Sequence, residues 1–234
     1  NGAKVTGTMD FVQKVTAYTP DCMSGEYDII FLMTKQQNNK DVVQMLKGYL
    51  APDGVLVTFQ NGLPEMQIAE ILGEERVLGC TVAWGATLQS PGVCELTSEP
   101  DALSYSLGAI SAKRSKHFNQ VKELLELMGK VDVEENFIGT RWSKLLINAA
   151  FSGMSAVLGC TFGEAAKPRE SRRIVQAIIK ECNKLGFRYG SVTYDGAAPH
   201  IIIDNNPNGI GLLESFFDEN FLHKSLYNNE ILFL

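Results

Sequence analysis

The first half of this chain alternates nearly continuous apolar segments with amphipathic ones. Residues 28–34 and 55–60 are mostly apolar, which is typical of strands that are buried on both faces. Residues 38–49 and 64–72 carry apolar side chains at the spacing of a helix. Residues 76–84 have the composition of a third strand. This order of strands and helices predicts an α/β fold built on a parallel, doubly wound sheet.

The pattern changes near residue 138. Before this point the chain favours an amphipathic helix over residues 113–128 and several short strands. After it helical spacing dominates, so we expect two domains, a sheet domain over residues 1–138 and an all-helical domain over residues 139–234. In the second domain, Gly, Pro, Asn and Asp residues at 189–211 predict a loop. The other predicted elements are strands at 93–96, 104–107 and 130–133 and helices at 140–158, 169–185 and 212–222.

Composition argues against several classes of function. The net charge is −6 and the sequence has no basic block, so we expect neither nucleic acid nor an anionic membrane as a partner. No apolar run approaches the ~20 residues of a membrane span. The five cysteines are scattered and form no C-x-x-C pair, which suits reduced thiols in a cytoplasmic protein. The three histidines also lie far apart in the sequence, and we predict no metal site.

A row of polar residues recurs every four positions in an otherwise apolar segment. Lys144, Asn148 and Ser152 share one face if residues 140–158 form a helix. A buried ammonium or amide group needs a partner, because leaving it unpaired is costly. Such a row, facing a cleft, suits a small acid with a polarised carbonyl group. The alternative is a polar stripe that faces water at a domain edge, as on many ordinary helices.

Polar residues also close the first two predicted strands. Thr34-Lys35 ends the first strand, and Gln60-Asn61-Gly62 ends the second. Sheets of this kind bind ligands outside the carboxyl ends of their strands. A lysine there can meet a phosphate or a ribose, and an asparagine amide can bond a nicotinamide or a carboxylate. The alternatives are a solvated lysine at Lys35 and simple turn chemistry at Asn61, since Asn-Gly favours positive φ.

Six short motifs between residues 28 and 186 resemble those of the ketopantoate reductase (2-dehydropantoate 2-reductase) family. Each motif is weak alone, but their order and spacing make the match specific. They are Thr34-Lys35 after an apolar strand, Gln60-Asn61-Gly62-Leu63, Arg76-Val77-Leu78-Gly79, Gly85-Ala86 with Pro91-Gly92-Val93, Trp142-Ser143-Lys144-Leu145 with Asn148, and Gly163-Glu164.

The resemblance implies a fold, a cofactor and an activity. The family has an N-terminal Rossmann domain that binds NADPH and a helical C-terminal domain. By this resemblance, residues 1–138 form a partial dinucleotide-binding domain and residues 139–234 a substrate and catalytic domain. The implied enzyme is an NADPH-dependent oxidoreductase that reduces a small 2-oxo acid, 2-dehydropantoate, to pantoate in pantothenate and coenzyme A biosynthesis. The positions that match residues lining the cofactor are Lys35, Asn61 and Ala86.

The resemblance also implies roles for substrate residues. Lys144 matches the family's catalytic lysine, and Asn148 matches a substrate-binding asparagine. Ser152 stands where many members have a second asparagine, and Asn61 lines the inner cleft. Ser225, in a late His-Lys-Ser segment, is a candidate ligand of the substrate carboxylate. In the implied reaction the cofactor delivers a hydride to the C2 carbonyl carbon, while Lys144 polarises the carbonyl oxygen and donates a proton.

Two family features have no counterpart in the sequence. These are the glycine-rich phosphate loop and a late catalytic glutamate, so we expect a chain that is truncated at both ends and binds NADPH weakly. Three functions stay open: ketopantoate reductase, a sister reductase of another 2-oxo acid, and a non-catalytic protein that retains the fold. A homodimer is left open as the assembly, because no sequence feature sets the oligomeric state.

Overall fold

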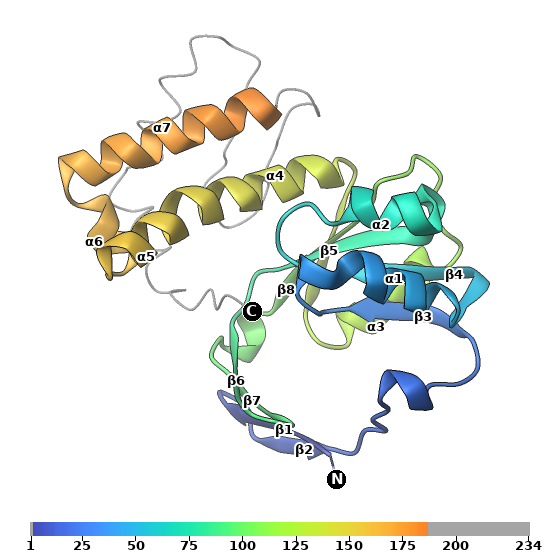
Figure 1. The fold of residues 1–234 in the computed structure, drawn as a ribbon. Helices are drawn as coiled ribbons and strands as arrows, with labels where there is room; N and C mark the ends of the chain where they lie inside the picture. Colours follow the sequence, from blue (N-terminus) through green and yellow to red (C-terminus); the bar gives the residue numbers. More distant parts are fainter. Residues whose placement is uncertain (1, 187–234) are drawn as a thin grey trace. The chain divides into compact units, whose positions relative to one another are not determined.

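The chain folds into two compact units. The computed structural model describes residues 2–186, apart from the side chains of Ile147 and residues 182–186. The first unit runs to Glu135 and the second begins at Asn136. Figure 1 shows β-sheets in the first unit and helices in the second.

The larger sheet of the first unit confirms the predicted α/β order. Its strands lie in the order β3 (Tyr27–Leu32), β4 (Leu50–Thr58), β5 (Val77–Val82), β8 (Ser104–Ala109) and β9 (Lys130–Glu134). β3, β4 and β5 are parallel, as predicted. β8 then runs antiparallel to β5, because the connection between them contains a β-hairpin and no crossover helix. β9 pairs parallel with β8.

Helices cover both faces of this sheet. α1 (Asn39–Lys47) and α2 (Glu65–Leu72) pack on one face, and α3 (Phe118–Glu126) packs on the other. Side chains alternate along β4, so that Val57 packs toward α3 and Leu56 packs toward α1 and α2. Because both faces are covered, the strand is apolar without interruption, which is the pattern that identified it in the sequence.

A wide bulge interrupts the pairing of β3 with β4. Pro52-Asp53-Gly54 has the composition of a turn, but in the structure this segment belongs to β4. The pairing passes from Tyr27 with Leu50 to Ile29 with Val55, so β4 advances by five residues while β3 advances by two. The additional residues of β4 are accommodated in the bulge, which replaces the predicted turn.

Arg76 holds this bulge in place. Its guanidinium group donates hydrogen bonds to the main-chain oxygens of Ala51 at 2.6 Å, Gly54 at 3.1 Å and Leu50 at 3.4 Å. A planar guanidinium group with several donors can satisfy several carbonyl groups at once. The arginine of the Arg76-Val77-Leu78-Gly79 motif therefore has a structural task, which is to fix the shape of a neighbouring strand.

A smaller sheet contains three strands that the sequence did not predict. Its order is β2 (Phe11–Gln13), β1 (Ala3–Gly7), β7 (Val93–Leu96) and β6 (Ala86–Ser90), and only β7 was predicted. β2 is exposed along its whole length, so it has no apolar pattern. β1 is a strand because it pairs in parallel with β7, which lies far along the chain.

The second unit confirms the predicted helical pattern. It contains α4 (Phe137–Ile147), a π-helical turn (Asn148–Ser152), α5 (Gly153–Leu158), α6 (Phe162–Ala166) and α7 (Arg169–Gly186). The core of the unit is formed by Leu146, Ala150, Phe151, Met154, Ala165, Ala166, Val175 and Ile179. No helix within residues 2–186 has the length and apolar character needed to cross a membrane.

α6 begins with a capping box formed by Thr161 and Glu164. The Thr161 hydroxyl oxygen accepts a hydrogen bond from the Glu164 N–H at 3.3 Å. The Glu164 carboxylate in turn accepts one from the Thr161 N–H at 2.9 Å. This main-chain bond is the largest cause that lowers the pKa of the Glu164 carboxyl group below its usual range. The Thr-x-x-Glu spacing therefore marks the start of a helix.

We expect Thr161→Ala to lower the free energy of unfolding by about 1 kcal/mol, the usual effect of losing a cap. Because the pKa of Glu164 is lower in the folded chain, its stabilising contribution is fully present above about pH 4.5 and is lost as the pH falls through the folded pKa. Urea denaturation of the parent and of Glu164→Gln, at about pH 7 and at about pH 3, measures this contribution as the difference in the free energy of unfolding between the two proteins. An equal difference between the two proteins at both pH values would contradict the assignment.

Candidate active site

Lys35 and Asn61 occupy matching positions on neighbouring parallel strands. The last paired residues of β3 and β4 are Leu32 and Thr58, and the lysine and the asparagine each follow three residues later. This confirms the prediction that both lie at the carboxyl ends of adjacent strands, where such sheets bind ligands. Lys35 is exposed and Asn61 is half-buried. The edge of the sheet therefore presents an ammonium group and an amide group.

The two strand ends are joined by the buried side chain of Gln60. Its amide nitrogen donates to the Thr34 main-chain oxygen at 2.6 Å and to Asn39 Oδ1 at 2.7 Å. Its amide oxygen accepts from Asn39 Nδ2 at 2.9 Å and from the Thr58 hydroxyl group at 3.2 Å. Buried polar groups are stable only when satisfied in this way. The network ties the residue before the lysine to the residue before the asparagine, and it holds both positions.

The Asn61-Gly62 pair forms the kind of turn that an Asn-Gly sequence favours. Gly62 has φ +83°, which glycine adopts readily. The Asn61 main-chain oxygen accepts a hydrogen bond from the Gln36 side-chain amide. A Cβ atom on Gly62 would lie 2.8 Å from that same amide nitrogen. Within residues 2–186 the Asn61 side-chain amide has no protein partner, so the turn leaves it available to a ligand.

Ala86 follows the carboxyl end of β5, the third parallel strand, and begins β6. It is half-buried and pairs with Leu96 of β7. The preceding Gly85 N–H donates a hydrogen bond to the Ser98 hydroxyl oxygen at 2.9 Å. The Gly85 main-chain oxygen accepts one from Thr97 at 3.1 Å. These bonds hold the main chain where it passes from one sheet to the other.

Lys144, Asn148 and Ser152 lie on one continuous helical segment of the second unit. Lys144 is in α4, and the other two begin and end the π-helical turn. In an α-helix, a step of four residues overshoots a full turn by about 40°. A π-helical turn contains more than four residues, because its hydrogen bonds join residues five apart. The four-residue step from Asn148 to Ser152 therefore falls short of a full turn. This shortfall is opposite in direction to the overshoot between Lys144 and Asn148.

Two polar atoms of this row are buried without a partner. Asn148 Oδ1 and the Ser152 hydroxyl oxygen make no hydrogen bond within the described part of the chain. Ser152 is only 4% exposed, so a stripe that faces water does not describe it. Leaving such a group unpaired costs about 1–3 kcal/mol. Unpaired acceptors of this kind are typical of a site that is completed by a ligand or by water.

Sequence reasoning missed two hydroxyl groups on the same segment. Ser143 and Ser155 also have buried side-chain oxygens without a partner among the described residues. Neither falls on the four-residue spacing that singled out the polar row, so no pattern pointed to them. The predicted substrate residue Ser225, the predicted loop at 189–211 and the predicted helix at 212–222 lie outside the described residues.

Comparison with protein families gives two matches. The family model described as Ketopantoate reductase PanE/ApbA matches residues 1–109, and the one described as Ketopantoate reductase PanE/ApbA C terminal matches residues 136–221. The second match begins at the first residue of the second unit. The strand-end residues fall within the first match, and the polar row of α4 and the π turn falls within the second.

Curated proteins named 2-dehydropantoate 2-reductase match most of this chain. The 2-dehydropantoate 2-reductase of Streptococcus pyogenes serotype M3 is 27% identical over 183 residues, which is 77% of this chain and 59% of the relative. The 2-dehydropantoate 2-reductase of Pyrococcus horikoshii is 28% identical over 190 residues, covering 80% of this chain and 61% of the relative. The chain therefore spans about three-fifths of the length of these relatives.

Solved structures share the fold. The 2-dehydropantoate 2-reductase of Geobacter metallireducens superposes with a TM-score of 0.72 at 22% identity, covering 93% of this chain and 69% of that chain. A D-mandelate dehydrogenase in complex with NADH and anilino(oxo)acetate gives a TM-score of 0.71 at 18% identity, covering 93% and 67%. The fold is thus common to enzymes of different names. Because the family's two models match both structural units, the chain belongs to the ketopantoate reductase family.

Proposed function

We propose that this chain provides the catalytic residues of an NADPH-dependent 2-dehydropantoate 2-reductase, which reduces 2-dehydropantoate to pantoate. The names of the curated relatives support this substrate. The observation that carries the proposal is the polar row of the second unit, where Asn148 Oδ1 and the Ser152 hydroxyl oxygen are buried without a partner one and two turns beyond Lys144. A small acid with carboxyl and hydroxyl groups would satisfy them.

The first unit suits a nicotinamide cofactor. Lys35 offers an exposed ammonium group for a phosphate, and the Asn61 side-chain amide offers both a donor and an acceptor. Both lie at the carboxyl ends of parallel strands, and Ala86 follows the third such strand. We assign the cofactor to this unit, roughly residues 1–138, and the substrate to residues 139–234. When bound, the cofactor supplies the hydride.

Lys144 is the proposed proton donor. As an ammonium group beside the C2 carbonyl oxygen, it would stabilise the negative charge that develops there and then transfer a proton to it. Asn148 and Ser152 would orient the carboxylate and hydroxyl groups of the substrate, and Ser225 is a further candidate ligand for the carboxylate. Fixing the carbonyl group in one orientation contributes to the rate, because a misplaced carbonyl loses the gain from proximity.

A second candidate is a reductase of another 2-oxo acid. Its support is the shared fold with a D-mandelate dehydrogenase whose structure contains NADH and anilino(oxo)acetate. Steady-state kinetics of the whole protein separate the two. We expect kcat/KM for 2-dehydropantoate with NADPH to exceed that for phenylglyoxylate, pyruvate and 2-oxoisovalerate by at least about tenfold, a difference of ~1.4 kcal/mol in transition-state binding.

The same assay includes both cofactors. A higher kcat/KM with NADH than with NADPH would contradict the cofactor assignment. A preference for phenylglyoxylate would favour the second candidate. A folded protein that reduces none of these acids would remove both.

A further inference from the structure

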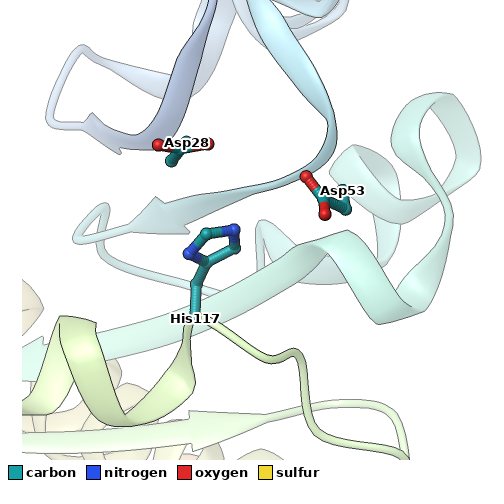
Figure 2. A group of neighbouring side chains, drawn as sticks. All are labelled: Asp28, Asp53 and His117. Atoms are coloured by element: carbon teal, nitrogen blue, oxygen red, sulfur yellow. The ribbon is translucent and has the colours of Figure 1, made fainter.

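A second group of ionisable side chains lies near the amino-terminal ends of the parallel strands β3 and β4 in the larger sheet, opposite the strand ends that Lys35 and Asn61 follow. Asp28 is at the start of β3, Asp53 lies in the bulge of β4, and His117 immediately precedes α3. One potential ligand atom from each lies within 4.8 Å of the other two. Figure 2 shows the imidazole ring extending from the start of α3 toward the two carboxyl groups. The proposed cofactor residues are at the other ends of the same strands.

The β4 bulge brings the two aspartates together. It forms where the pairing of β3 with β4 shifts, immediately beside Asp28. Gly54 allows the close approach, since a Cβ atom there would lie 3.0 Å from the Asp28 main-chain oxygen. The guanidinium group of Arg76 holds the carbonyl groups of the bulge. Asp53 is therefore presented next to Asp28 by a braced main chain, while both carboxyl groups stay exposed.

His117 supplies the observation that points to a ligand. Its side chain is only 9% exposed, and its Nε2 atom makes no hydrogen bond within residues 2–186. The other ring nitrogen, Nδ1, lies 3.0 Å from the Gln120 amide oxygen, which can only accept a hydrogen bond. A hydrogen bond from the Nδ1–H group to that oxygen leaves the lone pair of the ring on Nε2. This is the arrangement by which an outer partner prepares a histidine to bind a metal.

We propose that Asp28, Asp53 and His117 bind a divalent transition metal ion, with Zn²⁺ as the best match. An imidazole nitrogen with carboxylate oxygens suits Zn²⁺, whereas Mg²⁺ prefers oxygen ligands alone. Ligand atoms around a tetrahedral Zn²⁺ are about 3.4 Å apart. Separations within 4.8 Å must therefore close by at most about 1.4 Å. Rotation of two exposed aspartate side chains provides this movement while the histidine stays fixed.

Lys116 is a competing cation at this site. Its ammonium group pairs with Asp53 Oδ2. The ion pair engages Oδ2 of Asp53 and leaves Oδ1 for a metal ion. Because the Lys116 side chain is 62% exposed, it can swing into solvent when an ion binds.

Titration of the chain with Co²⁺, followed by visible absorption and then by displacement with Zn²⁺, tests the proposal. Co²⁺ reports its ligands, because cysteine thiolates add a charge-transfer band in the near ultraviolet. We expect one Co²⁺ per chain without that band, full displacement by one equivalent of Zn²⁺, and no displacement by Mg²⁺. Asp28→Asn/Asp53→Asn and His117→Gln should abolish binding at concentrations that saturate the parent. Gln120→Ala should weaken it by about tenfold, as for the loss of an outer partner.

The exposed Asp101 provides a matched control, and Asp101→Asn should bind Co²⁺ like the parent. The double aspartate variant keeps the proposal testable if His117→Gln fails to fold, since both carboxyl groups are exposed. Three results would overturn the site: no Co²⁺ binding by the parent, a thiolate band in the bound spectrum, or binding that survives the Asp28→Asn/Asp53→Asn change.

Discussion

Replacing Lys144 by alanine in the whole protein is expected to lower kcat for 2-dehydropantoate reduction by roughly 10²–10⁴-fold, the usual effect of losing an acid–base group. The lysine precedes Asn148 by four residues on the helix whose buried acceptors are unsatisfied. The affinity for NADPH should change little, because the lysine is assigned to the substrate. Turnover and melting temperature are measured on the same preparation, so that a loss of folded protein is not mistaken for a loss of chemistry.

Lys180, an exposed lysine on α7, offers a matched control. Lys180→Ala should keep the parent's turnover and melting temperature. If Lys144 is only a structural charge, its removal will lower stability and leave the turnover per folded molecule nearly unchanged. A folded Lys144→Ala protein with turnover within about threefold of the parent, a gap of under ~1 kcal/mol, would remove this lysine from the mechanism.

Gln60→Ala is expected to lower the free energy of unfolding by about 2–4 kcal/mol. The change removes both partners of the Asn39 side-chain amide, which is 1% exposed and would keep a donor and an acceptor without a hydrogen bond. It also removes the donor to the Thr34 main-chain oxygen. Urea denaturation of the chain, followed by far-ultraviolet circular dichroism, gives the free energy directly.

A control and a double variant separate the network from a simple loss of side-chain volume. Gln67 is exposed on α2, and Gln67→Ala should change stability by less than about 0.5 kcal/mol. The double change Asn39→Leu/Gln60→Leu should cost less than the sum of the single leucine changes, because it leaves neither side-chain amide of the pair without its partner. Additive costs would show that the two amides do not act as one unit.

The strands that carry the proposed cofactor residues could be predicted because their signals are local. β3, β4 and β5 are covered on both faces, so the sequence of each strand is a nearly continuous apolar run. The helices that connect these strands favour parallel pairing. Neighbouring parallel strands have their carboxyl ends on the same side of the sheet. Lys35 and Asn61 could therefore be placed at matching positions from the sequence alone, without knowledge of any contact between them.

The features that escaped prediction depend on distant parts of the chain. β1 is defined by its pairing with β7, and the β4 bulge is held by Arg76, which follows it by more than one element. The π turn is a shift of main-chain hydrogen bonds that no residue type signals. His117 meets Asp28 and Asp53 only after three elements have packed, so the spacing of histidines in the sequence was uninformative.

The π turn also sets the phase of the helix that follows it. In a regular α-helix each residue advances the side chain by about 100°, so deleting one residue from the turn would rotate all of α5 by that angle relative to α4. Met154, now in the core, would leave it, and the second unit would have to repack. A one-residue deletion here is therefore far less tolerable than a substitution. The extra residue of the π turn sets the rotation of α5 relative to α4. It thereby lets one continuous helical segment keep its polar residues on one side and its core residues on another.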